Sequence, residues 1–169
     1  MDKTPVRILG IDPGLNITGY GVLEVTPHGP RLVEAGVIRG RGRSLEGRLL
    51  ELHDGVTDVI RTLCPTVFAI EQLYSHYERP RTAILMGHAR GVLCLAATQA
   101  GLPIRHFAAT QVKKTLTGNG RAAKAQMQRA VAREFNLLAA PDPPDVADAI
   151  AIALCEYYQN DLKHQSKPA

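Results

Sequence analysis

Two predicted strands that end in a carboxylate constrain this chain most. The first lies in "RILGID" and ends at Asp12, and the second lies in "TVFAIE" and ends at Glu71. Such apolar runs suit buried strands, where a carboxylate costs free energy unless a partner compensates its charge. Ligands of open α/β sheets bind at the carboxyl ends of strands, so both residues are candidates for one site. Taken singly, either carboxylate would equally suit a turn or a helix cap.

The order of the predicted elements indicates an α/β fold. Apolar runs at 6–12, 17–25 and 31–38 are joined by short connections, which predicts an antiparallel meander. Helices and strands alternate after this meander, which predicts a mixed sheet with helices on both faces. The expected strands are 66–71 and 102–107, and the expected helices are 44–63, 80–100, 109–116, 121–135 and 144–158.

Length and composition predict one domain over residues 1–160, followed by a flexible tail at 161–169. A chain of 169 residues is long enough to bury a core of its own. No run approaches the roughly 20 apolar residues of a membrane helix, and the start resembles no signal peptide. We therefore expect a cytoplasmic protein. The three cysteines are far apart without zinc-ligand spacing, and we expect them to be small buried hydrophobic residues.

Positive charge is concentrated in two segments. The net charge is only +4, but residues 105–133 contain seven lysines and arginines and no acidic residue. A second cluster, "RGRGR" at 39–43, occupies a glycine-rich loop. One-sided charge of this kind is typical of nucleic-acid binders. Charge alone leaves an ordinary solvated surface equally open.

Two further carboxylates strengthen the expected site. Asp145 and Asp148 lie three residues apart, hence on one face of the last predicted helix. Alone they would merely complement the helix dipole. Together with Asp12 and Glu71 they would repel one another, and a hard divalent cation such as Mg²⁺ or Mn²⁺ relieves that repulsion. Two such ions can activate a water and stabilise the leaving oxygen of a phosphodiester, which indicates a metal-dependent nuclease.

Five segments carry a family resemblance at this point. In order, "GIDPGLNITGYGVLE", "AIEQLY", "ARGV", "QVKKTLTGNGRAAKAQ" and "PPDVADAIAIAL" resemble motifs of the RuvC Holliday junction resolvases. The resemblance extends from about Arg7 to Tyr158. It implies a ribonuclease H-like fold, with a five-stranded mixed sheet whose first three strands are antiparallel and which is flanked by helices. It also implies an Mg²⁺-dependent endodeoxyribonuclease of recombination and repair that makes paired symmetric nicks in four-way DNA junctions with water as nucleophile.

The resemblance assigns roles residue by residue. It implies two metal ions per site, a homodimer with contacts through the 80–100 helix, and partnership with a branch-migration complex. An aromatic residue at position 74 would stack on bases at the junction centre, although a core tyrosine is an alternative there. The implied residues are Asp12, Glu71, Asp145 and Asp148 for catalysis and metal binding, and Tyr74, Lys113 and Lys124 for DNA binding.

Three other readings remain open at this stage. A ribonuclease H-like nuclease with another substrate, such as an RNA–DNA hybrid or ordinary duplex, would share the fold and the carboxylates. A non-catalytic junction-binding protein predicts lost carboxylates, whereas all four are present. A sugar kinase or actin-like ATPase also begins with a strand, Asp and Gly, but needs two such domains to close over a nucleotide.

Overall fold

A five-stranded mixed sheet forms the centre of the molecule. The computed structural model describes residues 5–73 and 80–165. The sheet order is β3-β2-β1-β4-β5, with β1–β3 antiparallel and β4 and β5 parallel to β1. The predicted sheet is therefore confirmed. Its strands are β1 (Arg7–Asp12), β2 (Ile17–Thr26), β3 (Gly29–Arg39), β4 (Val67–Glu71) and β5 (Ile104–Phe107).

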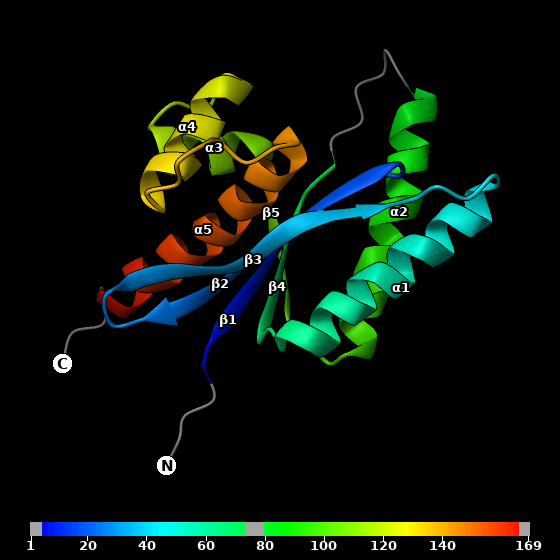
Figure 1. Ribbon diagram of the computed structural model, residues 1–169, viewed down its shortest axis with the longest axis horizontal. Helices are drawn as coiled ribbons and strands as arrows, with labels where there is room; N and C mark the ends of the chain where they lie inside the picture. Colours follow the sequence, from blue (N-terminus) through cyan, green and yellow to red (C-terminus); the bar gives the residue numbers. More distant parts are fainter. Residues whose placement is uncertain (1–4, 74–79, 166–169) are drawn as a thin grey trace.

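Helices cover both faces of this sheet (Figure 1). On one face α5 lies against the strands, and α3 and α4 pack on α5. On the other face α1 and α2 pack together over a second core. No helix of the described residues is long and apolar enough to cross a membrane. The helices are α1 (Leu45–Leu63), α2 (Pro80–Gln99), α3 (Ala109–Thr117), α4 (Lys124–Glu134) and α5 (Pro144–Gln165).

The alternation of side chains along β1 decides which face its final carboxylate occupies. Ile8 belongs to the core under α5, whereas Leu9 and Ile11 belong to the core under α1 and α2. Because side chains of a strand alternate between faces, Asp12 shares the face of Ile8. The same alternation in β4 places Glu71 on the face of Val67 and Ala69, which also belong to the α5 core. Both strands therefore aim their terminal carboxylates at the side of the sheet that α5 covers.

Glycines let α5 approach the sheet unusually closely. A Cβ atom added to Gly10 would lie 2.2 Å from the carbonyl oxygen of Ala149. One added to Gly21 would lie 2.8 Å from Cγ1 of Ile150. The helix backbone occupies the space that side chains would need, so the position of α5 over β1 and β2 is fixed by steric contact.

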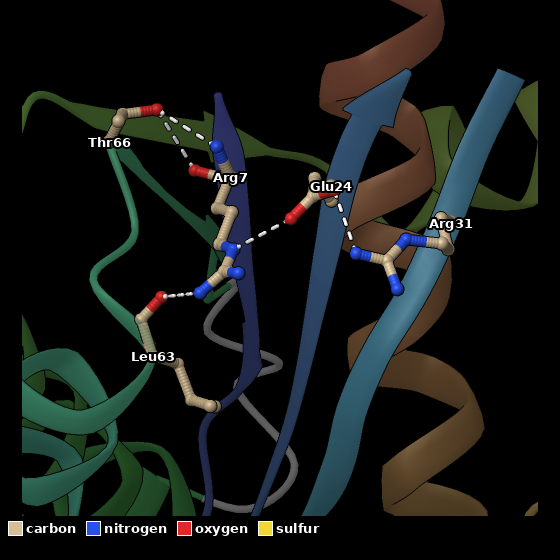
Figure 2. A network of polar contacts seen from close by, with 5 residues as sticks. All are labelled: Arg7, Glu24, Arg31, Leu63 and Thr66. Carbon is tan, nitrogen blue, oxygen red and sulfur yellow. Dashed lines mark hydrogen bonds and ion pairs between the residues drawn. The ribbon is translucent and has the colours of Figure 1, made fainter. Parts of the chain in front are cut away.

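A polar network connects the strands at the end of the sheet where β1 begins, opposite the end that carries Asp12 (Figure 2). Arg7 begins β1, and its side chain pairs with Glu24 at 3.1 Å and donates to the carbonyl of Leu63 at 2.8 Å. Glu24 also accepts from Arg31 on β3 at 2.8 Å. The hydroxyl of Thr66 donates to the carbonyl of Arg7 at 3.1 Å. The network joins the first three strands to the segment that leads from α1 into β4.

The structure corrects three details of the sequence prediction. Helix α4 begins at Lys124 rather than at residue 121, because "TGNGRAA" forms turns in which the Asn119 side chain accepts from the amide of Arg121 at 2.9 Å. Helix α5 continues to Gln165, past the expected end at Tyr158. Cys64 is exposed, not buried, because it ends α1 in the left-handed conformation with φ of 47°.

Candidate active site

The four predicted carboxylates line a single cavity. Asp12 comes from β1, Glu71 from β4, and Asp145 and Asp148 from the first turns of α5. The open volume is about 360 Å³. Three elements that are distant in the sequence thus contribute acidic side chains to one place, as the sequence predicted.

Backbone pairing fixes the relation between the first two carboxylates. Strands β1 and β4 are parallel, with Ile11 beside Ile70. The next residues in that register are Asp12 and Glu71, on adjacent strands about 4.8 Å apart. Their relative position is therefore set by the hydrogen-bonded ladder of the sheet.

Close contact between α5 and β2 fixes the other two carboxylates. Gly19 is the cross-strand partner of Asp12, and a Cβ atom on Gly19 would lie 2.0 Å from the carbonyl oxygen of Asp145. The first turn of α5 therefore lies directly over the strand position beside Asp12. Since residues three apart share a helix face, Asp148 lies on the same side of α5 as Asp145.

Burial and mutual repulsion raise the pKa values of three of these carboxylates. Desolvation, followed by the charges of Glu71, Asp148 and Asp145, raises the pKa of Asp12 to about 8. Desolvation also raises the pKa values of Glu71 and Asp148 above their usual range. A cluster of this kind favours any bound cation that offsets the negative charge, so the electrostatics fit a divalent metal.

Two lysines supply positive charge at the rim of the cavity. Lys113 on α3 and Lys124 at the start of α4 both line it. Each lowers the pKa values of Glu71 and Asp148, in opposition to burial. The remaining lining is largely apolar, with Met86, Val112 and Met127. The cavity thus combines acidic residues from β1, β4 and α5 with lysines from α3 and α4.

The donor set fits a hard cation, although the side chains do not yet surround one. All four carboxylates offer oxygen ligands, the type that Mg²⁺ and Mn²⁺ prefer. Within residues 5–73 and 80–165, no three acidic, imidazole or thiol side chains converge closely enough to enclose an ion. Repulsion among uncompensated carboxylates favours this open arrangement.

Comparison with known proteins identifies the family. The family model described as "Crossover junction endodeoxyribonuclease RuvC" matches residues 8–156. The chain belongs to the RuvC family. A RuvC from Rhodopirellula baltica is 57% identical over 154 residues, which cover 89% of this chain and 85% of that protein.

Solved structures agree with this RuvC assignment. The structure of Thermus thermophilus RuvC superposes with a TM-score of 0.84 at 31% identity, covering 94% of this chain and 97% of that one. Thermus thermophilus RuvC in complex with a Holliday junction substrate gives a TM-score of 0.83 at 31% identity, covering 94% and 96%. The expected ribonuclease H-like fold class is thereby confirmed.

One of the predicted DNA-binding residues is not among the residues that the structure describes. Tyr74, the candidate for base stacking, lies outside the described residues. Its role stays a prediction, as do the catalytic roles of the four carboxylates and the phosphate contacts of Lys113 and Lys124.

Arg90 supports the end of β4 from outside the cavity, and the sequence analysis gave it no individual role. It lies in the "ARGV" segment on α2, and its Nε donates to the backbone carbonyl of Glu71 at 3.0 Å. A terminal guanidinium nitrogen lies 2.6 Å from Nδ1 of His106, which therefore accepts the hydrogen bond. Burial, then the charge of Arg90, lowers the pKa of His106. Arg90 thus links α2 to the end of the strand that carries Glu71, a long-range contact for which the sequence holds no local signal.

Replacing Arg90 with Gln is expected to destabilise the protein. The variant loses two hydrogen bonds from a charged donor, which together are worth about 2 kcal/mol. For a domain of this size the melting temperature should fall by roughly 4–8 °C. Calorimetry beside Arg129→Gln, an exposed arginine of α4, provides the comparison. Equal melting temperatures of the two variants would show that the Arg90 contacts add nothing to stability.

Proposed function

We propose that this chain is a structure-selective DNA endonuclease that resolves four-way junctions by paired symmetric nicks, in recombination and repair. The observation that carries the proposal is the convergence of Asp12, Glu71, Asp145 and Asp148 on one cavity in a chain of the RuvC family. The solved complex of Thermus thermophilus RuvC with a Holliday junction substrate supports the choice of substrate. The reaction is hydrolysis of a phosphodiester, with water as the nucleophile.

The four carboxylates would hold Mg²⁺, or Mn²⁺ in its place, with two ions per site. Bound metal supplies Lewis acidity toward the phosphate and lowers the pKa of a coordinated water. The chain's own residues prepare this chemistry. The sheet and α5 hold the acidic groups in position, and Met86, Val112 and Met127 form an apolar part of the cavity lining beside them. Lys113 and Lys124 bind the phosphate oxygens beside the bond that is cut.

Cleavage of an immobile four-way DNA junction tests the proposal. End-labelled junctions of several central sequences are incubated with the protein in EDTA, in Mg²⁺ and in Mn²⁺. A linear duplex and an RNA–DNA hybrid are treated in parallel. Symmetric nicks that need metal and occur only in the junction are the expected result. Cleavage of the hybrid alone would assign another ribonuclease H-like activity, and binding without nicks would leave a junction-recognition protein.

Replacing Lys124 with Ala is expected to slow junction cleavage about 10- to 100-fold. The lysine offsets the acidic charge of Asp12, Glu71 and Asp148, so its removal raises their pKa values further. The acidic limb of the pH–rate profile should therefore move to higher pH. Single-turnover rates across pH measure both effects. Lys114→Ala, an exposed lysine outside the cavity lining, is the matched control. A Lys124 variant whose profile equals that of the control would make this lysine an ordinary surface residue.

A homodimer is part of the proposal, because symmetric nicks need two sites. Helix α2 exposes two large apolar side chains, Ile84 at 62% and Leu95 at 51%. Gly87 and Gly91 leave open space on the same helix, where another backbone can approach.

Ile84→Glu should shift the protein from dimer to monomer in sedimentation velocity at micromolar concentration, whereas Leu138→Glu, at a fully exposed leucine, should not. A dimer that survives Ile84→Glu unchanged would exclude this surface. Partnership with a branch-migration complex stays a prediction from the family resemblance.

A further inference from the structure

The loop between β3 and α1 carries positive charge that the proposed catalytic chemistry does not use. Its sequence "RGRGR" places Arg39, Arg41 and Arg43 at alternate positions, and all three are exposed. Within the described part of the chain, their side chains form no hydrogen bond or ion pair. The three guanidinium groups are therefore available to an external partner.

The two glycines of the loop determine the direction of the arginines. A Cβ atom on Gly40 would lie 2.3 Å from the carbonyl oxygen of Leu15, and one on Gly42 would lie 2.8 Å from the amide nitrogen of Arg48. Both positions therefore face the body of the protein at distances that only glycine tolerates. The three arginines between and beside these glycines are exposed instead, so their side chains are accessible from solvent.

Polar contacts hold this loop in one conformation. The carboxylate of Glu51 on α1 accepts from the backbone amides of Arg41 and Gly42, the latter at 2.9 Å. The guanidinium of Arg48 donates to the carbonyl of Gly42 and to the side-chain oxygen of Asn16, each at 2.8 Å. A loop that is ordered before binding loses less conformational entropy when a ligand arrives.

The contacts with Asn16 place the loop beside the candidate active site. The amide of Gly40 donates to the backbone carbonyl of Asn16 at 3.1 Å. Asn16 ends the short turn that begins after Asp12, and Pro13 and Gly14 of that turn line the cavity. Two residues of extended chain, from Gly14 to Asn16, reach at most about 7 Å. The arginines therefore lie near the cavity, on the side of Asp12.

The loop and the lysines flank the cavity from different layers of the molecule. Lys113 and Lys124 belong to α3 and α4, which pack on α5, whereas the loop leads into α1 on the opposite face of the sheet. In Figure 1 the cyan segment between β3 and α1 lies on one side of the ends of β1 and β4, and α3 and α4 lie on the other. A DNA strand that crosses the cavity would meet positive charge on both sides.

We propose that Arg39, Arg41 and Arg43 form a second phosphate-binding surface. This surface binds one DNA arm, on the side of the cavity that is away from Lys113 and Lys124. The proposal rests on the proposed function and adds to it a contact surface for the sugar-phosphate backbone. Arginine forks match phosphate oxygens bidentately. Residues 39–44 contain only arginine, glycine and serine and lack the apolar and aromatic anchors of protein interfaces, so the chemistry favours the sugar-phosphate backbone of a nucleic acid.

Salt-dependent binding of the triple variant Arg39→Gln/Arg41→Gln/Arg43→Gln tests this surface. Junction affinity is measured in EDTA, so that the readout does not depend on cleavage. Each phosphate contact adds about 0.9 to the slope of log K against log salt, so the slope should become shallower by about 2 to 3. Affinity at low salt should fall at least 10-fold. The melting temperature should stay at the wild-type value, because the replaced side chains form no hydrogen bond or ion pair within the described chain.

Arg61→Gln is the matched control for a change of surface charge. Arg61 is on the same helix as Glu51 but about 24 Å along its axis from Leu45, and its side chain is 78% exposed. Its replacement should leave the salt slope unchanged. A triple variant with the wild-type slope would overturn the second surface while leaving the proposed function intact.

Junctions with single neutral methylphosphonates locate the contact on the DNA. Methylphosphonates placed near the cut in one arm should weaken junction binding by the wild-type protein. The same methylphosphonates should not weaken binding by the triple variant any further. If the same positions weaken both proteins equally, the arginines act through general charge and the proposed contact is wrong. Wild-type protein that binds no junction at all would instead overturn the proposed function, and this surface with it.

Discussion

Asp12→Asn is expected to lower the rate of junction cleavage by about 10³-fold or more, because the proposed metal site would lose a charged ligand, at a cost of several kcal/mol of transition-state stabilisation. Junction binding should persist, since it depends on phosphate contacts of basic residues. Single-turnover cleavage in Mg²⁺ and binding in EDTA measure the two effects separately. Full cleavage by this variant would exclude Asp12 from the site.

In the absence of metal, Asp12→Asn should increase the stability of the folded protein, although it impairs cleavage. The pKa of Asp12 is raised to about 8 from its ordinary value of 3.8, so the folded protein holds a proton that the unfolded chain releases between those values. Its contribution to wild-type stability is complete below about pH 4 and is lost as pH rises toward 8. Glu71 and Asp148 shift in the same direction.

Denaturation in EDTA between pH 5 and 8 measures this difference. The advantage of Asp12→Asn over wild type should grow as the pH rises, because asparagine fills the same space without a charge. Added Mg²⁺ should raise the melting temperature of the wild-type protein and have much less effect on the variant. If the stability of the wild-type protein did not change with pH over this range, ionisation of the acidic cluster would cost little free energy in the folded state.

Gly10→Ala is expected to destabilise the fold by about 3 kcal/mol or more. The new methyl group would lie 2.2 Å from the carbonyl oxygen of Ala149 and 2.7 Å from the amide nitrogen of Ala153, which are backbone atoms of a buried helix. Overpacking of this kind typically costs 1–3 kcal/mol, and rigid backbone on both sides leaves little room for relaxation. The melting temperature should fall by at least roughly 6–12 °C.

Gly87→Ala provides the control for this prediction. It makes the same chemical change in α2, where an added Cβ meets no atom within 4 Å. Measured in the Ile84→Glu background, where the proposed dimer surface is disrupted, this variant should gain up to about 1 kcal/mol, because alanine is the better helix former. Equal stabilities of the two variants would mean that α5 does not lie against β1 as closely as described.

Local patterns predicted most of the fold and the members of the site. Apolar runs that end at Asp12 and Glu71 marked two strands correctly, and the three-residue spacing of Asp145 and Asp148 placed them on one helix face. The antiparallel first three strands followed from short connections early in the chain, and the mixed sheet with helices on both faces followed from alternating helices and strands later. These features depend on neighbouring residues, which a sequence displays directly.

Tertiary contacts set the features that the sequence did not predict. The close seating of α5 depends on Gly10, Gly19 and Gly21, and in a sequence each resembles an ordinary glycine within a strand. The hydrogen bond from Arg90 to the end of β4 joins residues whose proximity only the folded chain reveals. Cys64 ends its helix in a left-handed conformation, where glycine is usual, so its apolar surroundings in the sequence misled the prediction of burial.

The division of the acidic cavity between β1 and α5 has a consequence for translation. The ribosome makes Asp12 early and Asp148 late, and the chain order places every other strand and helix between them. A nascent or truncated chain that ends before Pro144 lacks two of the four carboxylates and the helix that covers β1 and β2. Such a fragment exposes apolar sheet surface to chaperones and proteases and holds no complete acidic cluster. The cell therefore acquires a competent nuclease only when synthesis of the domain is nearly finished.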